Sequence, residues 1–354
     1  MDSDVGKAKI ISIINYKGGV GKTVSAFNIA AGLNFLNQNS VLLIDLDPQC
    51  SLSTICMRAY SKTKGEHIRF SSLKEEETIN HIFNSYLNRE ILDFDVPFNL
   101  DKLIKHNFYT GGKYKLQKFD FIPSSMYSNS HQGMMRGLEG IESEIKRRFG
   151  DDGNSSIKRL SILAKFLKEV ELDQKYDFII FDCPPSNNFI VQNALFVSDY
   201  YVVPTIMDEM GVQGINHLKN IVENDSVQII CKQYRSLIDL APSNSYLSYL
   251  KSGSPKMIGI IETLRKASSS KGGTEAEQWR RFVETKLPGM LFTPVVYHQV
   301  EVQKLINAGE CCFINWKRNG TLPANESYGQ IVFDLLDRIN VPKSQFSREI
   351  TDIL

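Results

Sequence analysis

Short, unbroken runs of apolar residues recur along this chain, separated by segments long enough to form helices. Five such runs are Ile10–Ile14, Val41–Ile44, Phe178–Phe181, Tyr200–Val203 and Met257–Ile261. Strands with one wet face alternate apolar and polar residues, whereas continuous apolar runs are typical of parallel strands buried on both faces. The pattern therefore predicts an α/β protein with a doubly covered, mainly parallel sheet.

The segments between these runs predict the covering helices, of which Val24–Leu36 and Ile157–Leu172 are two. A chain of 354 residues could hold one or two domains. The sequence contains no internal repeat and no low-complexity linker that would mark a boundary. We therefore expect a single domain that spans residues 1–354.

A glycine-rich segment directly follows the first apolar run and precedes the first helix. Glycines let successive backbone N–H groups turn toward a phosphate, and the N-terminus of the helix favours an anion there. An ordinary P-loop reads G-x-x-x-x-G-K-[ST], but Tyr16 stands where its first glycine belongs, so this loop is a deviant form. The expected nucleotide-binding set is Lys17, Gly18, Gly19, Val20, Gly21, Lys22, Thr23 and Val24.

Two lysines flank the glycines and take different roles. By its spacing, Lys22 reaches the β- and γ-phosphates, and the Thr23 hydroxyl takes one coordination position on Mg²⁺. Lys17 is not needed for the same phosphates. We expect it to reach across an interface to the nucleotide of a second subunit, like an arginine finger supplied in trans. The loop thus predicts a protein that binds a nucleotide with Mg²⁺ and contacts the nucleotide of a second subunit.

On these residues the chain resembles the ParA/MinD family of deviant Walker ATPases. Val41–Gln49 is similar to the family's second motif, Phe178–Ser186 to its Walker B strand and turn, and Phe121–Ser124 to a strand that ends in Ile-Pro-Ser. The resemblance implies a P-loop NTPase fold of the SIMIBI type. Asp47-Pro48-Gln49 favours the ParA branch over the MinD branch.

The resemblance also implies roles for the acidic residues. Asp182 would be the magnesium-side carboxylate acting through a coordinated water, with Asp45 supporting the metal shell. Asp47 would orient the attacking water, and the adenine base would lie near Pro294. The expected catalytic set is then Lys17, Lys22 and Asp47, and the expected metal set is Thr23, Asp45 and Asp182.

The resemblance runs through most of the chain, with family-variable insertions around 57–119 and 223–256 whose role the sequence does not assign. It implies an ATPase that closes as a nucleotide sandwich dimer, binds DNA non-specifically and drives plasmid or chromosome partitioning with a ParB-like partner. Hydrolysis is expected to be slow and stimulated by the partner. Because no apolar run approaches the ~18 residues of a membrane span, we expect a cytoplasmic, nucleoid-associated protein without a transmembrane segment.

DNA contacts would have to come from local basic clusters, since the formal net charge is only +1. The family's non-specific contacts lie on and after the helices that follow Walker B. Such clusters more often form a solvated helix face, so this reading stays open. The candidate DNA-binding set is Lys219, Arg265, Lys266 and Lys271.

Other classes of protein remain to be weighed. A membrane-surface ATPase of the MinD kind needs a basic amphipathic helix, but the charges around Phe346, Ile350 and Ile353 sum to zero. Docking of this tail on the protein's own core is the expectation. An ATP switch that positions proteins without binding DNA shares every site residue and is kept as the alternative. The six cysteines include no Cys-x-x-Cys pair, which argues against metal or iron–sulfur chemistry.

Overall fold

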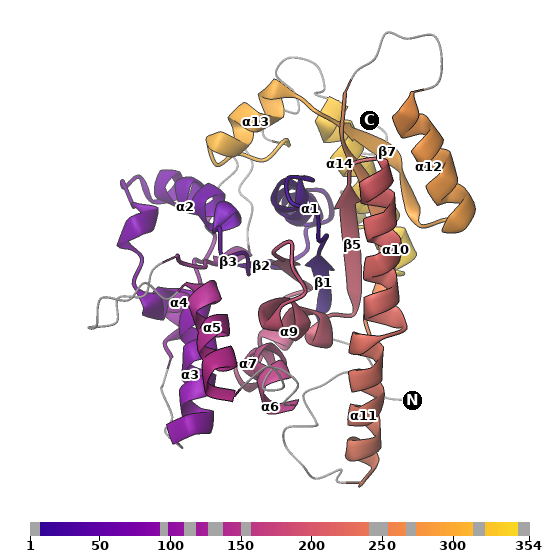
Figure 1. Ribbon diagram of the computed structural model, residues 1–354. Helices are drawn as coiled ribbons and strands as arrows, with labels where there is room; N and C mark the ends of the chain where they lie inside the picture. Colours follow the sequence, from indigo (N-terminus) through magenta and orange to yellow (C-terminus); the bar gives the residue numbers. More distant parts are fainter. Residues whose placement is uncertain are drawn as a thin grey trace.

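Seven strands form one sheet in the computed structural model of the chain (Figure 1). The strand order is β3-β2-β4-β1-β5-β6-β7, and each of these neighbouring strands pairs in parallel. The predicted α/β fold with a parallel sheet is confirmed. The structure describes residues 8–92, 98–109, 118–126, 137–149, 157–240, 254–266, 274–313 and 323–345.

Each apolar run of the sequence becomes a strand. Every residue of β2 and β4 is buried, because helices cover both faces of the sheet at its centre. The strands are β1 (Lys9–Ile13), β2 (Val41–Asp45), β3 (Phe119–Ile122), β4 (Phe178–Asp182), β5 (Tyr200–Thr205), β6 (Lys256–Arg265) and β7 (Leu291–Tyr297).

The helices of the described residues alternate with these strands. They are α1 (Lys22–Asn37), α2 (Ser51–Lys64), α3 (Ile79–Leu92), α4 (Leu100–Leu103), α5 (Leu138–Phe149), α6 (Ile157–Leu160), α7 (Ile162–Glu169), α8 (Leu172–Lys175), α9 (Phe189–Val197), α10 (Glu209–Glu223), α11 (Ser226–Leu240), α12 (Glu275–Lys286), α13 (Val300–Asn307) and α14 (Pro323–Arg338). Two short 3-10 helices, η1 (Phe70–Ser72) and η2 (Glu75–Glu77), precede α3.

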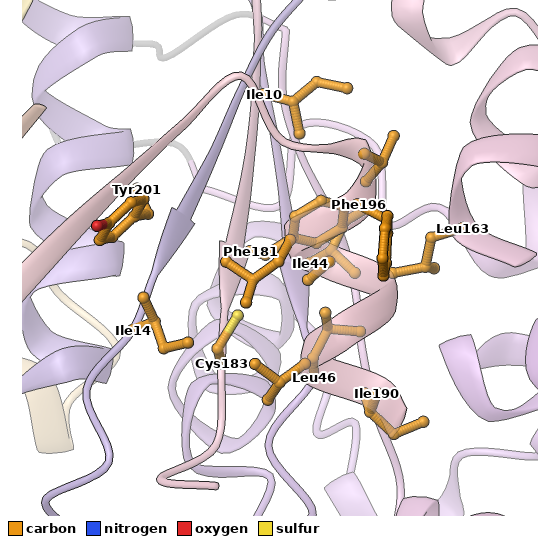
Figure 2. Close-up of a cluster of buried hydrophobic side chains, with 14 of the residues drawn as sticks. Ile10, Ile14, Ile44, Leu46, Leu163, Phe181, Cys183, Ile190, Phe196 and Tyr201 are labelled. Atoms are coloured by element: carbon orange, nitrogen blue, oxygen red, sulfur yellow. The ribbon is translucent and has the colours of Figure 1, made fainter. Parts of the chain in front are cut away.

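Two hydrophobic layers hold the helices to the sheet. One layer joins the sheet to α1, α2 and α14, and the other joins it to α3, α5, α7, α9 and α10. Figure 2 shows part of the second layer, where Ile10, Ile44 and Phe181 of three neighbouring strands meet Leu163 of α7 and Ile190 of α9. This double covering fixes the carboxyl ends of β1, β2 and β4 side by side.

The segment predicted as one helix over Ile157–Leu172 is broken into α6, α7 and the start of α8, so that prediction was wrong. Ser161 leaves the helical conformation with φ −96° and ψ 7°, and Glu171 has the left-handed φ of 55°. Leu163 and Phe166 are nevertheless buried. The breaks carry no sequence signal such as proline or glycine, so the length of the segment alone suggested one continuous helix.

The two predicted insertions contribute further helices to the fold. Residues 57–119 supply η1, η2, α3 and α4, and Lys105 adds an antiparallel bridge to Phe121 at the edge strand β3. Residues 223–256 supply α11, which extends beyond α10 (Figure 1). The tail residues Phe346, Ile350 and Ile353 lie outside the described residues. Within the described chain, no helix is both long and apolar enough to span a bilayer.

Candidate nucleotide site

The glycine-rich loop connects β1 to α1 at the carboxyl edge of the sheet, where ligands of such sheets bind. Gly19 and Gly21 have positive φ values of 71° and 80°, which other residues adopt at a cost. Among the described residues, no atom lies within 4 Å of the position that a Cβ would take at Gly18 or Gly19. The loop therefore leaves open space beside the first backbone N–H groups of α1, which suits an anion.

Two side chains anchor this loop, Asn15 just after β1 and Thr263 of β6. Asn15 donates from Nδ2 to the carbonyl of Pro204 at 2.8 Å, and its Oδ1 accepts the backbone N–H of Lys17 at 2.9 Å. Thr263 donates from Oγ1 to the carbonyl of Val20 at 2.7 Å. Sequence reasoning missed both anchors. Asn15 could have been suspected from its place directly before the loop, whereas Thr263 carries no signal in the sequence.

Tyr16 occupies the position that holds glycine in an ordinary P-loop. Its ring meets His217 of α10 edge-on, with the ring centroids 6.0 Å apart. Its hydroxyl is buried and has no hydrogen-bond partner among the described residues. Burial raises the pKa of Tyr16 to about 12. The side chain thus packs the base of the loop against α10, which accounts for an aromatic residue at this position.

The two lysines of the loop have different environments. Lys22 is buried, and its Nζ donates to the carbonyl of Lys17 at 3.0 Å. Burial lowers the pKa of Lys22, while the charges of Asp182 and Asp47 oppose that shift. Lys22 therefore points its ammonium group into the region of the acidic residues, as a phosphate-binding lysine must.

Lys17 pairs with a carboxylate of its own chain. Its Nζ lies 2.6 Å from Oδ2 of Asp208, and both side chains are partly exposed. The other oxygen of Asp208 caps α10 by accepting the N–H of Gly211 at 2.6 Å. Burial alone would raise the pKa of Asp208, but the hydrogen bonds from Lys17 and Gly211 lower it overall. The predicted role of Lys17 in trans stays a prediction, and Asp208 is a partner that the sequence did not reveal.

Asp45, at the end of β2, is surrounded by protein donors. Its Oδ2 accepts the N–H and the hydroxyl of Ser53 at 2.8 and 2.6 Å, and its Oδ1 accepts the N–H of Asp47 at 3.0 Å. The carboxyl group is fully buried, and burial raises its pKa to about 6 although these hydrogen bonds oppose the rise. The geometry gives Asp45 the task of tying the turn to the start of α2. Its predicted contact with the metal shell stays a prediction.

Asp47 lies in the turn that Asp45 holds. Its Oδ1 accepts the N–H of Gln49 at 2.8 Å, and its carbonyl accepts the N–H of Cys50 at 2.8 Å. Cys50 has φ 51°, the left-handed conformation, directly before α2. Asp47 is 8% exposed, and its charge acts on Lys22. Its role in orienting the attacking water stays a prediction.

Asp182, at the end of β4, contrasts with Asp45. It is completely buried, yet neither carboxylate oxygen has a hydrogen-bond partner among the described residues. Burial and then the neighbouring Asp45 raise its pKa, while Thr23 and Lys22 are close enough to oppose the rise. An unpartnered buried carboxyl group is costly, and a cation beside it would remove that cost. The residue therefore fits its predicted place beside Mg²⁺.

The described residues hold no group of three or more His, Cys, Asp or Glu side chains arranged to bind a metal ion. Magnesium sites are commonly completed by one or two carboxylates together with waters and substrate phosphates. Asp182 and the hydroxyl of Thr23 are the protein groups that fit such a shared site. Ser186, in the turn after β4, adds a buried hydroxyl that also lacks a partner in the described part of the chain.

At the predicted base end, Pro294 lies half-buried in the edge strand β7. Its assignment to the adenine pocket stays a prediction. Sequence reasoning missed Gln299, which begins α13 and has a buried Oε1 without a partner in the described regions. An orphaned acceptor at the carboxyl end of β7 is a further candidate for contact with a ligand.

The candidate DNA-binding residues are not equally available. Lys219 is paired with Glu223 one turn along α10, and Arg265 is paired with the buried Glu262. Lys266 is exposed at the end of β6. Lys271 lies outside the described residues. Two of the four predicted cations are therefore neutralised within the fold, and the DNA contacts stay a prediction.

Sequence comparison finds a family model and several relatives. A family model described as an AAA domain matches residues 8–235. The sporulation initiation inhibitor protein Soj of Bacillus subtilis is 28% identical over 258 residues, which are 73% of this chain and 79% of Soj. The chromosome partitioning protein ParA of Caulobacter vibrioides is 25% identical over 215 residues. That match covers 61% of this chain and 62% of that ParA, so it spans less than two thirds of its length.

Solved structures show the same fold. An ATP complex of McdA from Cyanothece superposes with a TM-score of 0.60 at 15% identity and covers 96% of this chain and 99% of McdA. Cobyrinic acid a,c-diamide synthase from Mycobacterium smegmatis, with bound ADP and magnesium, has a TM-score of 0.54 at 18% identity. That likeness covers 96% of this chain and 99% of the synthase.

The family model covers well over half of the chain, and its span contains the deviant P-loop and the strands that end in Asp45 and Asp182. Nucleotide hydrolysis is the general activity of such P-loop proteins. The chain therefore belongs to the ParA/MinD family of P-loop ATPases, on its ParA/Soj side.

Proposed function

We propose that the protein is a ParA-type ATPase that binds Mg-ATP, closes as a nucleotide sandwich dimer, binds DNA non-specifically and partitions a plasmid or chromosome region with a ParB-like partner. One observation carries the enzymatic part. The open glycine loop with Lys22 lies beside Asp182, whose buried carboxylate has no partner in the described structure. This is a site for a phosphate chain and a cation together.

Each residue has a defined task in this reaction. The backbone N–H groups of residues 18–23 and the ammonium of Lys22 hold the β- and γ-phosphates. Thr23 and Asp182 would hold Mg²⁺, which would supply positive charge to these phosphates. Asp47 accepts a hydrogen bond from the attacking water and orients it. Asp45 keeps Asp47 in place through the N–H that it accepts at 3.0 Å.

Dimer formation would use Lys17. In the free chain its ammonium is paired with Asp208, so a reach toward a second subunit requires that this pair separate. A partly exposed ion pair contributes only ~0–1 kcal/mol, which the γ-phosphate of a partner's ATP can outweigh. Lys17 can therefore leave Asp208 and contact the partner's ATP when two subunits associate. Removal of Lys17 should abolish dimer formation and lower turnover by roughly 10³–10⁵-fold while some ADP binding remains.

A second function is favoured by the neutralised cations. Lys219 is paired with Glu223, and Arg265 is paired with Glu262. The segments that follow β4 therefore present less positive charge to DNA than the sequence suggests. A MinD-like membrane-surface switch, or another protein-positioning ATP switch without DNA binding, would have the same nucleotide site. Nucleotide-dependent DNA binding separates the two functions.

The test is binding of random-sequence duplex DNA with ATP, with ADP and without nucleotide across a salt series. The Asp47→Ala variant is included because it should bind ATP, hydrolyse poorly and accumulate as dimer. Binding only with ATP that weakens as salt rises is the expected result, since phosphate contacts release counterions. Absence of binding in every state, with the ATP dimer still forming, would leave the positioning switch. Loss of ATP binding in Asp47→Ala would make Asp47 a structural residue.

A further inference from the structure

A chain of buried hydrogen bonds runs from Asp47 to the inserted helix α3. Ser124, which follows β3, donates its N–H to the hydroxyl of Ser53 at 2.8 Å. Its own hydroxyl lies 3.4 Å from the carbonyl of Asp47 and 3.2 Å from Sγ of Cys50. Ser53 and Ser124 are both completely buried. The backbone of the Asp47 turn therefore rests on the carboxyl end of the neighbouring strand.

Asn80 of α3 forms hydrogen bonds with the segment that follows β3. Asn80 is completely buried, donates from Nδ2 to the carbonyl of Ser125 at 2.8 Å and accepts the N–H of Ser125 on Oδ1 at 3.1 Å. The N–H of Ile79 donates to the carbonyl of Pro123 at 2.8 Å. One amide side chain thus satisfies both backbone groups of Ser125, which fixes that segment in two directions.

The second acidic loop is held in a similar way by α5, which packs against α3. Asn188 caps α9 by accepting the N–H of Val191 at 3.0 Å, and its Nδ2 donates to Oε2 of Glu142 at 2.9 Å. Asn188 lies six residues after Asp182 in the turn that also carries Ser186. The helices α3 and α5 therefore touch the supports of both loops that bear the catalytic and metal-side carboxylates.

We propose that α3 and α5 form a positioning element for ATP hydrolysis, with Asn80 setting the place of Asp47 and Glu142 setting the turn after Asp182. The inference rests on the proposed ATPase function and gives the insertion at 57–119 a role in it. Asn80 and Glu142 form hydrogen bonds with Ser125 and Asn188, which lie outside the P-loop. Each acts through backbone that the carboxylates need, so each should alter catalysis more than nucleotide binding.

The expected loss of kcat follows from how accurately the attacking water must be oriented. A displacement near 1 Å at the reacting centre can lower a rate by about 10²-fold even when the altered residue is remote. Asn80→Ala removes two hydrogen bonds from Ser125 and should let the Asp47 turn shift. We expect kcat to fall by about 10- to 100-fold while the KM for ATP changes by less than about threefold. Glu142→Ala should also lower kcat, because it removes the acceptor of the hydrogen bond from Nδ2 of Asn188.

Matched variants separate positioning from folding. Asn84 lies one turn further along α3 and donates to Oε1 of Glu75 at 2.6 Å, away from β3. Asn84→Ala should therefore leave kcat unchanged. Glu142→Gln keeps an acceptor for Asn188 and should restore the rate that Glu142→Ala loses. If Asn80→Ala does not fold, Asn80→Asp keeps the acceptor for the N–H of Ser125 and replaces the donor to the carbonyl of Ser125 with a carboxylate oxygen.

The deciding measurement is steady-state ATPase activity of the full chain in a double-mutant cycle with Asp47→Asn. If Asn80 acts through Asp47, its replacement adds less than about a twofold loss in the Asp47→Asn background, because residues that act as a unit are not additive. Equal losses in both backgrounds, or an unchanged kcat in Asn80→Ala and Asn80→Asp, would overturn the positioning role. If the wild-type protein hydrolysed ATP no faster than Asp47→Asn, the proposed ATPase function itself would be wrong.

Discussion

The loops after β2 and β4 start from the same sequence pattern and end in opposite states. Each begins with an aspartate at the end of a fully buried apolar strand, and Asp45 is paired with Asp182 in the register of the two strands. Asp45 accepts one hydrogen bond from the N–H of Asp47 in its loop and two from Ser53 in the first turn of α2. Asp182 accepts none from the described residues. The carboxyl group of Asp45 is fully hydrogen-bonded, whereas the buried carboxyl group of Asp182 has no hydrogen-bond partner in the described part of the chain, so a cation or a proton can bind there.

The difference indicates a division of labour between two carboxylates that the sequence does not distinguish. A buried carboxylate with a full set of donors orders the chain around it, and one without donors favours binding of a cation or proton. Replacing each residue should therefore move stability in opposite directions. Substitutions in the two loops test this expectation.

The largest effect is expected at Asp182. Asp182→Asn should lower kcat for ATP hydrolysis by roughly 10²–10³-fold, because a preorganised charge is lost from the transition state. The free protein should become more stable by about 1–3 kcal/mol, since an unsatisfied buried carboxylate is removed. Urea unfolding without nucleotide measures the second effect and an ATPase assay the first. A variant that is both inactive and less stable would show that Asp182 serves the fold.

Ser53→Ala tests the completed loop. It deletes the hydroxyl that donates to Asp45 at 2.6 Å and accepts the N–H of Ser124 at 2.8 Å. A hydrogen bond to a charged group contributes about 1.5–3 kcal/mol, so unfolding in urea should become easier by that amount. An unchanged urea midpoint and slope would mean that water replaces the hydroxyl and that the loop is not fixed by Asp45.

The pH dependence of stability should reveal the raised pKa of about 6 at Asp45. Between the ordinary carboxyl pKa near 4 and the folded value, the folded protein binds more protons than the unfolded chain. The free energy of unfolding contributed by this group therefore falls as pH rises from about 4 to 6, by on the order of 2 kcal/mol. The measurement is urea unfolding of wild type and Asp45→Asn across this range. A constant difference between the two would contradict the raised pKa.

The smallest effect is expected at Ser186, in the incomplete loop. Its hydroxyl has no partner among the described residues, so Ser186→Ala should change the stability of the free protein by less than about 0.5 kcal/mol, or raise it slightly. Its matched counterpart is Ser53→Ala in the complete loop. A clear loss of stability in Ser186→Ala would remove the contrast between the loops.

Much of this architecture was predictable from local pattern. The apolar runs marked the strands because a central strand of a doubly covered sheet must be apolar on both faces. The glycines and Lys22 marked the loop because phosphate contact requires bare backbone and a cation at fixed spacing. These features depend on residues that are neighbours in the chain.

The features that sequence reasoning missed depend on distant partners. Lys17 meets Asp208 from 191 positions away, and Thr263 reaches Val20 from 243 positions away. The hydrogen bonding of Asp45 depends on where α2 begins, because its donor Ser53 lies in the first turn of that helix. Asp182 has no such donor among the described residues. The availability of Lys219 and Arg265 for DNA likewise depends on carboxylates that the fold brings alongside them.

Cys50 shows how the turn after Asp47 is kept rigid. A non-glycine residue in the left-handed conformation costs roughly 1–2 kcal/mol, and glycine would remove that cost. Glycine would also give the turn many more conformations to sample. The chain thus retains backbone strain beside its expected water-orienting carboxylate, with the strain maintained by the N–H that Cys50 donates to Asp47 and the helix that follows. At this position thermodynamic stability is exchanged for a narrower conformational ensemble.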